Sequence, residues 1–452
     1  MNLTLAFRHV LAFSVLSPLL CAGQTAQAQW SQYQGNAAHT GCVPETVSGS
    51  RLIAGWSKTF SVNGQVARHS DIAVNAQGVY LNYQASSDYG DGSRYNVVSL
   101  NPATGQEQWS ASVDSYAGEV SAPSLGSGLL YVHAYGHSGI SGGNPSQYPH
   151  LVGINAATGQ SVFSTAHEGQ WDAGSRPTTL GNQVVALGGY YGGMDSHNAA
   201  TGARQWRIGM PQQYAFIPAM DTQRAYIYYG SGSASPGPRI SALYAINRAT
   251  GNIDAIIQNP SDPSTTFSSV SSVTLGGAND ALVTANSPNF SSRQVTAFNL
   301  LNHSIKWSRD LNVTSSPAVA GGIVAVALQN SLEMLKEANG ADLWTWNAPN
   351  GVSLSSNVVL TDNLAFVASG DTVFGVDRLT GTLDWSDYVG VEGNINGNQP
   401  YSLAYYGGTL YASGSTRLIT FDAVPEPTGI LLGGGLFAFG GGLLARRRFQ
   451  RR

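Results

Sequence analysis

The chain has 452 residues, of which 11% are charged and 54 are glycine. This length suits two or three ordinary domains or one large all-β domain, and the charged share is less than half of the usual one. Residues 29–445 hold 16 basic and 26 acidic side chains, and a net charge of about −10 argues against nucleic acid as a partner, because such binding needs a positive surface.

The first 28 residues are typical of an export signal. Arg8 and His9 precede the apolar run "VLAFSVLSPLLCAG", and "AQA" at 26–28 fits a cleavage site before Gln29. Lipid attachment at Cys21 is disfavoured because Leu20 stands where that motif needs a small residue. Removal of residues 1–28 leaves Cys42 as the single cysteine, so we expect an inert, unpaired thiol there.

A short pattern recurs along the body of the chain. "NPATGQEQW" at 101–109 returns as "NAATGQSVF" from 155, "NAATGARQW" from 198, "NRATGNIDA" from 247, "NLLNHSIKW" from 299, "KEANGADLW" from 336 and "DRLTGTLDW" from 377. The copies are 37 to 54 residues apart, and a period in this range indicates a propeller or a solenoid.

Each copy predicts an outer hairpin. A short strand precedes the turn, and a second strand follows it with an aromatic residue eight positions after the turn residue, except for Ala255 in the fourth copy. Asn or Asp can cap such a turn, and glycine supplies its positive φ. Two more strands separate successive copies, so each repeat predicts a four-stranded antiparallel blade whose aromatic residue lies between neighbouring blades.

The two ends of the repeat region predict how the ring closes. "RLITFDA" at 417–423 is an eighth pre-turn strand without a partner, and "RLIAGWSKTF" at 51–60 is a tryptophan strand without a predecessor. Pairing the two gives an all-β, eight-bladed propeller over residues 29–423, with its last blade closed by an N-terminal strand. Seven blades with loose ends is the alternative.

The repeats resemble those of the pyrroloquinoline-quinone-type (PQQ-like) β-propeller family, and "WSQYQGNAAHTG" from Trp30 is similar to the family's lead-in. For enzymatic members the resemblance implies a tryptophan floor, a lid of adjacent disulfide-bonded cysteines, a bound calcium ion and an aspartate base. This sequence has no adjacent cysteines and no clear cluster of acids. We therefore expect no cofactor, no metal and no catalytic residue, although the family includes enzymes, assembly scaffolds and proteins of unknown role.

Strand alternation predicts that the blade-to-blade connections and the long second-to-third-strand insertions share one face, opposite the Thr-Gly turns. The candidate ligand residues at the central mouth of that face are His69, Asp71, Trp171, Arg176 and Tyr214, with Arg68, Glu119, Asp172 and Phe216 beside them. Aromatic faces, amides and hydroxyls suit a neutral, hydroxyl-rich ligand such as an exopolysaccharide. The competing interpretation is that the aromatic residues pack between blades and that the polar loops only solvate the surface.

The tail predicts a membrane segment and a sorting signal. Residues 429–445 are uncharged and mostly apolar, which is the short limit for a transmembrane helix. Arginines 446, 447, 448, 451 and 452 follow, and they hold that end in the cytoplasm. With Pro425, Glu426 and Pro427, residues 424–452 resemble the PEP-CTERM signal of exported Gram-negative proteins. The resemblance implies that an exosortase recognises this signal, whose residues are Pro425, Glu426, Pro427, Arg446, Arg447 and Arg448, and that the tail is then removed. It also implies a setting of exopolysaccharide and biofilm production.

The sequence thus predicts an exported propeller, anchored in the membrane before processing, that acts as a non-catalytic binding or scaffold module at the cell envelope or in the extracellular matrix. Its expected partners are the sorting enzyme and a polysaccharide or an envelope protein. A PQQ-dependent dehydrogenase and a scaffold for outer-membrane assembly are the alternatives.

Overall fold

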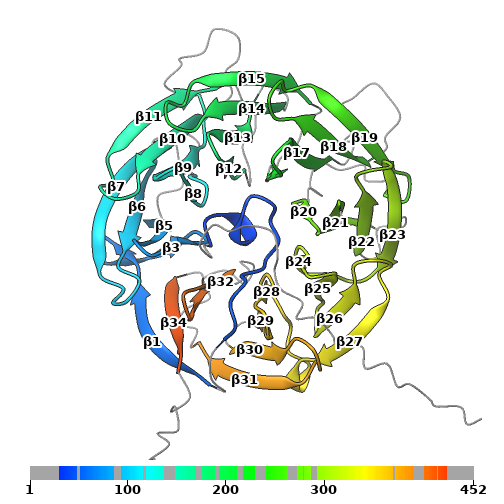
Figure 1. Ribbon diagram of the computed structural model, residues 1–452. Coiled ribbons are helices and arrows are strands. Elements are labelled where there is room, and N and C mark those ends of the chain that lie inside the picture. The colour runs from blue at the N-terminus through cyan, green and yellow to red at the C-terminus, as the bar shows by residue number, and fades with distance from the viewer. Residues whose placement is uncertain are drawn as a thin grey trace, which may run out of the picture.

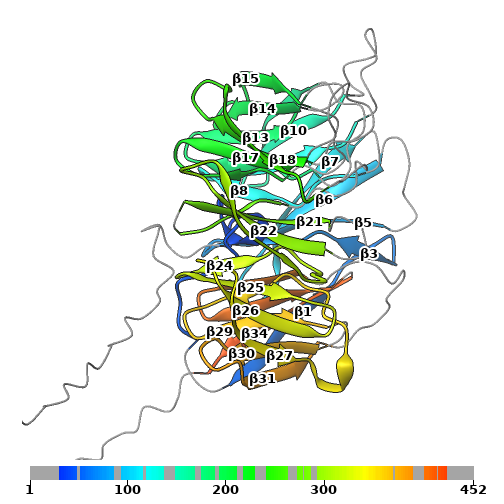
Figure 2. The same ribbon diagram turned by 90° about the vertical axis from the view of Figure 1, so that its right-hand side faces the viewer.

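The chain forms a closed ring of eight antiparallel blades (Figure 1), and edge-on the ring is a single disc (Figure 2). The computed structural model describes residues 30–47, 51–85, 93–115, 119–136, 148–167, 175–188, 193–210, 217–229, 241–262, 272–277, 279–286, 293–369, 372–389, 402–414 and 416–424. This architecture confirms the predicted all-β propeller.

Each blade has four strands, numbered outward from the channel. The first four blades are β4(Ala73–Val74)–β5(Val79–Ala85)–β6(Ser93–Leu100)–β7(Glu107–Ser115), β8(Ser124–Gly126)–β9(Leu129–Ala134)–β10(His150–Asn155)–β11(Ser161–Ala166), β12(Thr178–Leu180)–β13(Gln183–Leu187)–β14(Gly193–Asn198)–β15(Arg204–Gly209) and β16(Ala219–Met220)–β17(Arg224–Tyr229)–β18(Ser241–Asn247)–β19(Ile253–Asn259). The next three are β20(Thr274–Leu275)–β21(Asp280–Asn286)–β22(Arg293–Asn299)–β23(Ser304–Asp310), β24(Ala318–Ala320)–β25(Ile323–Ala327)–β26(Ser331–Lys336)–β27(Asp342–Asn347) and β28(Val359–Leu360)–β29(Leu364–Ala368)–β30(Thr372–Asp377)–β31(Leu383–Tyr388).

The eighth blade joins the two ends of the ring. Its strands are β32(Ser402–Tyr406), β33(Thr409–Ser413), β34(Arg417–Ala423) and, outermost, β1(Leu52–Thr59). β1 pairs antiparallel with β34, so that Leu52 faces Ala423 and Thr59 faces Arg417. The predicted closure is confirmed, and the seven-bladed alternative is wrong. The hairpin of β2(Ser61–Val62) and β3(Gln65–His69) extends the first blade beside β5, which the sequence did not predict.

The repeated tryptophan ties each blade to the next. The indole N–H of Trp56 donates to the backbone oxygen of Pro102, the residue after the turn asparagine of the following blade, at 2.8 Å. The same bond recurs between Trp109 and Ala156 (3.0 Å), Trp206 and Arg248 (2.7 Å), Trp307 and Glu337 (2.8 Å), and Trp344 and Arg378 (3.0 Å). The eighth blade has no such turn, and there Trp385 donates to Leu52, the first residue of β1, at 3.0 Å. The tryptophans therefore lie between blades, as predicted.

This contact gives the turn glycine a second role. Gly105 has a φ of 67°, and a Cβ on it would lie 2.4 Å from the ring of Trp56. Gly251 repeats both features, with a φ of 77° and 2.8 Å to Trp206. Glycine is needed both for the left-handed backbone and for the close approach of the preceding blade's indole.

The seam between the fourth and fifth blades lacks both the tryptophan and the turn glycine of this contact. Ala255 of the fourth blade stands where the tryptophan would be, and the turn that it faces has His303 in place of glycine, at a φ of 55°. The backbones of the outer strands β19 and β23 approach each other at this seam. Ala255 packs there with Leu300 and Ile305 against the apolar core of the two blades.

The paired loss predicts a coupled effect. We expect Ala255→Trp alone to lower the free energy of unfolding by about 1–3 kcal/mol, because the closed seam has no room for an indole. In the double variant with His303→Gly, part of that loss should be recovered, with a coupling of about 1 kcal/mol. Urea unfolding of the parent, both single variants and the double variant measures it, and strictly additive effects would show that the two positions are independent.

The N-terminal segment runs through the channel and touches every blade (Figure 1). Residues 30–45, which include the 3₁₀ turn η1(Tyr33–Gly35), make main-chain contacts that start at Trp30 with Val74 and continue through Leu125, Met220, Leu275, Val319 and Leu360. Gln32 reaches Thr179 of the third blade, and Glu45 reaches Gly407 and Gly408 of the eighth. The segment closes the channel at the ends of the innermost strands.

Cys42 of this segment is disulfide-bonded in the full-length chain, whereas the sequence predicts an unpaired thiol. That expectation applied to a chain cut before Gln29, whereas the full sequence also holds Cys21, outside the described residues.

In the part of the chain that the structure describes, no helix has the length and hydropathy needed to cross a membrane. The predicted span 429–445 and the sorting residues also lie outside the described residues.

The strand order defines two faces of the disc. The turn face carries the outer hairpin turns between third and fourth strands, together with the ends of β34 and of the innermost strands. The loop face carries the opposite strand ends, with the described connections 311–317 and 348–358 between blades and 328–330 between a second and a third strand. The strand ends fit the predicted division between faces, and the long insertions lie largely outside the described residues.

Candidate functional site

The neck is the loop-face end of the central channel, and a repeated serine shapes it. Ser70 Oγ accepts the backbone N–H of Asn82 at 3.0 Å and donates to the backbone oxygen of Asp71 at 2.8 Å. Ser356 does the same between Ala368 (2.7 Å) and Asn357 (2.8 Å). Each serine fixes the entry to the first strand of a blade, so that the following residue lies at the neck.

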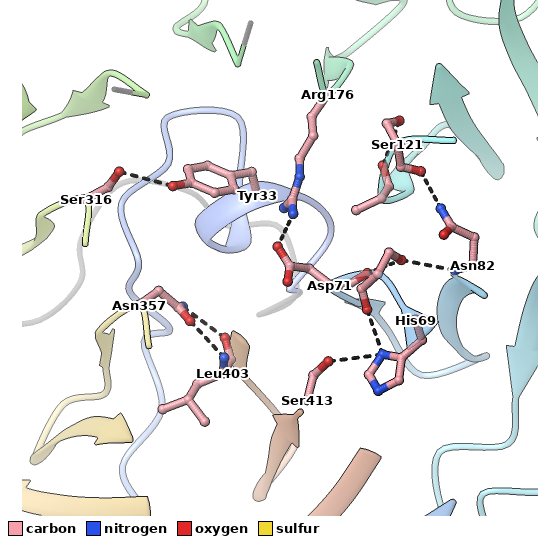
Figure 3. Close-up of polar contacts among 12 residues, drawn as sticks. Tyr33, His69, Asp71, Asn82, Ser121, Arg176, Ser316, Asn357, Leu403 and Ser413 are labelled. Carbon is pink, nitrogen blue, oxygen red and sulfur yellow. Dashed lines mark hydrogen bonds and ion pairs between the residues drawn. The ribbon is translucent and has the colours of Figure 1, made fainter. Parts of the chain in front are cut away.

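Figure 3 shows the polar contacts at this neck. Asp71 of the first blade forms an ion pair with Arg176, which precedes the third blade. The guanidinium lies 5.1 Å from the ring centroid of Tyr33, and the Tyr33 hydroxyl is 3.0 Å from Ser316 Oγ of the sixth blade. The Arg176 and Asp71 side chains are 20% and 30% exposed, so solvent reaches the pair. The group spans the channel through the central Tyr33.

His69 lies beside this neck but serves the seam between the first and last blades. Its Nδ1 is 2.9 Å from the Ser70 oxygen and 3.2 Å from Ser413 Oγ, and its ring packs against Phe60 with centroids 5.0 Å apart. Burial lowers the pKa of His69 from its usual value, although a backbone hydrogen bond to Ser70 partly opposes that shift. His69 is therefore neutral near pH 7 and acts as a packing group with one polar edge.

The neck has a buried floor supplied by the N-terminal segment. Gln34 donates to the Ser316 oxygen at 3.3 Å and accepts from Thr274 at 3.2 Å. His39 is fully buried, with Nδ1 3.0 Å from the Val273 oxygen. Burial lowers the pKa of His39 to about 3, and Arg176 adds to the shift. The site thus combines one solvent-accessible ion pair with hydroxyl and amide groups. Such groups can bind a polar ligand through hydrogen bonds.

The structure brings together two of the five predicted ligand residues, Asp71 and Arg176, and places His69 near them. Trp171 and Tyr214 lie outside the described residues, so their role stays a prediction. The sequence reasoning missed Tyr33, Ser316 and Asn357. The serine that recurs before the first strands, in "HSDIAV", "VSAPSL" and "LSSNVV", is the signal that could have found the neck.

The described neck residues do not fit a quinone cofactor of the type that the resemblance implies. Asp71 is held by Arg176, and Tyr33 and Arg176 stack across the channel. Within the described ranges, no three His, Cys, Asp or Glu side chains form a group that could hold a metal ion. The sequence also lacks the adjacent cysteines of the lid.

The fold and neck define an eight-bladed propeller with a channel closed by its own N-terminal segment. The family model described as "Outer membrane protein assembly factor BamB" matches residues 93–345 and 291–424. The chain belongs to this family of PQQ-like repeat proteins. No curated protein sequence matches the chain.

Solved structures share the fold at low identity. BamB from Moraxella catarrhalis is 14% identical with a TM-score of 0.57, covering 82% of this chain and 100% of its own. The computationally designed protein Ika8 is 13% identical with a TM-score of 0.57, covering 83% and 100%. The quinohemoprotein alcohol dehydrogenase ADHIIG from Pseudomonas putida HK5 is 12% identical with a TM-score of 0.57, covering 90% and 83%. A fold shared by an enzyme, an assembly factor and a designed protein does not assign function.

Proposed function

We propose that this chain is an exported, non-catalytic binding or scaffold module of the cell envelope or extracellular matrix. The observation that carries the proposal is the closed channel: Tyr33 and the Asp71–Arg176 pair span its neck, and residues 30–45 fill its other end. Catalytic sites are usually deep and concave. A neck filled from within supports recognition of a ligand or a partner across the loop face.

The proposed location rests on the two chain ends. The export signal of residues 1–28 sends the body outward, and the tail of residues 424–452 anchors it in the membrane until a sorting enzyme of the exosortase type recognises Pro425, Glu426 and Pro427 and removes the tail. The envelope setting named in the family description supports this location. Mass spectrometry of the protein from its own host tests both ends: we expect an N-terminus at Gln29 and a C-terminus without Arg446, Arg447 and Arg448.

The proposed ligand is a neutral, hydroxyl-rich chain such as an exopolysaccharide, bound at the loop-face mouth by Asp71, Trp171, Arg176 and Tyr214. His69 is not part of this group because it packs in the seam between the first and last blades. We expect Trp171→Ala and Tyr214→Ala each to weaken retention on the polysaccharide about tenfold, the equivalent of about 1.4 kcal/mol, because the flat aromatic faces would stack on sugar rings. A pull-down with purified matrix polysaccharide measures this. Leu343→Ala, an exposed change on β27 at the outer rim, is the matched control. Equal retention by all forms would remove the polysaccharide from the proposal.

A scaffold for assembling outer-membrane proteins is the second candidate, and the family description favours it. If the chain is such a scaffold, we expect envelope proteins rather than glycan to co-purify with it. The dehydrogenase alternative has a separate test: the purified protein is mixed with the quinone and calcium, and dye-linked alcohol oxidation is followed. Turnover that depends on the added quinone would replace the binding proposal with an enzymatic one.

A further inference from the structure

The turn face carries an apolar residue at the tip of every outer hairpin turn. The third residue of each turn is exposed and uncharged: Ala103, Ala157, Ala200, Ala249, Leu301, Ala338 and Leu379. Leu301 and Leu379 are 73% and 70% exposed, more than any other large hydrophobic residue among those described. A short residue suits the turn itself, but two leucines that bury almost nothing contribute little to folding.

Three charged groups near these tips are directed into the protein, whereas Lys336, Arg204 and Asp342 beside other turns are exposed. The Asp377 carboxylate caps its own turn by accepting the N–H groups of Leu379 (3.0 Å) and Thr380 (2.7 Å). The guanidinium of Arg378 is buried and donates to the Ala320 oxygen at 2.8 Å. Glu45 accepts the N–H groups of the hairpin turn between β32 and β33. The tips themselves therefore present apolar groups on a ring of turns that lies at one face of the disc (Figure 2).

The last described residue places the tail on this same face. β34 ends at Ala423, and Val424 donates its backbone N–H to the Arg51 oxygen at 3.2 Å. The sequence has four residues between Val424 and the apolar segment 429–445. A chain of that length spans at most about 18 Å even when fully extended. The apolar segment must therefore begin close to the turn face.

We propose that the turn face lies on the lipid bilayer while the tail is attached, with Leu301 and Leu379 in contact with lipid and the loop-face mouth directed away. The inference rests on the membrane anchoring in the proposed function and adds the orientation of the body. The short link brings the bilayer to this face, and the exposed leucines at the tips of two turns can insert into the interface while the charged side chains nearby stay at headgroup level. The mouth then faces the matrix, where a soluble ligand can reach it.

The test uses the full chain reconstituted in vesicles of phosphatidylethanolamine and phosphatidylglycerol. A photo-reactive benzoylphenylalanine is placed at position 301, at position 379 or, as matched control, at position 293. Arg293 begins β22 at the loop face, Leu301 follows the end of the same strand at the turn face, and both are exposed. After irradiation, we expect lipid adducts by mass spectrometry from positions 301 and 379 in several-fold excess over position 293. Urea unfolding midpoints first establish that each variant is folded.

Two results would overturn the orientation. Lipid adducts from position 293 that equal those from 301 and 379, in a chain that resists extraction with alkaline carbonate, would show a body without a preferred face and would leave the anchoring intact. Loss of the unmodified chain from the vesicles on carbonate extraction would overturn the anchoring and the orientation together. The extraction needs no probe, so the failure of the proposed function is distinguished from the failure of this inference.

Discussion

Replacing Trp385 by alanine should lower the free energy of unfolding by about 3–5 kcal/mol, as for other large buried aromatic residues. Trp385 is 8% exposed and lies at the seam where the seventh blade meets the blade that closes the ring. Its ring packs against Phe421 with centroids 5.2 Å apart, and its indole N–H donates to the Leu52 oxygen. The substitution removes both the buried area and the bond that holds β1 at the closing seam.

Two further variants separate these contributions in the same urea titration. Trp385→Phe keeps most of the buried ring but leaves the Leu52 oxygen without its donor, so we expect a loss of about 1–2 kcal/mol. Leu343→Ala changes an exposed residue and should stay within about 0.5 kcal/mol of the parent. If Trp385→Ala unfolds at the same urea concentration as Leu343→Ala, the indole contact does not hold the ring closed.

The blade architecture could be predicted because its information is local. An asparagine or aspartate that caps a turn, and a glycine four residues later, mark a hairpin wherever they stand. At Asp377, for example, the carboxylate accepts two backbone N–H groups of its own turn. The unpaired strands at the two ends then fixed the closure, because an exposed sheet edge is unfavourable and the two edges complement each other.

The neck and the N-terminal segment could be predicted only in part, because their contacts are long-range and leave little trace in the residue types. Residues 30–45 meet the innermost strands mainly through backbone groups, which every residue has. Asp71 and Arg176 could be predicted because strand alternation assigns the connections between blades to the central mouth. Tyr33 was missed because a single tyrosine in an irregular segment does not indicate which blade it will meet.

Acid should destabilise this protein strongly, because several histidines are buried in neutral form. His133 and His167 stack with their Nε2 atoms 2.7 Å apart, and neither Nδ1 has a partner. Burial lowers the pKa of His133 to about 3, with His150 and His197 adding to the shift, and burial also lowers the pKa of His167 well below its usual value. His39 at the channel floor has a pKa of about 3 for the same main reason.

The sign follows from proton linkage. The unfolded chain takes up protons on these histidines below about pH 6.5, whereas the folded chain does not until about pH 3, so stability falls as the pH drops through that window. At pH 5 each such histidine costs about 2 kcal/mol, so His39 and His133 together should remove about 4 kcal/mol relative to pH 7.

Urea unfolding at pH 8, 7, 6 and 5 measures this effect. These histidines should contribute almost no difference in the free energy of unfolding between pH 8 and pH 7. His133→Gln keeps a polar partner for His167 without a titratable ring, and its loss between pH 7 and pH 5 should be smaller by about 2 kcal/mol. An identical loss in the variant and the parent would mean that His133 is not the neutral buried group that its contacts indicate.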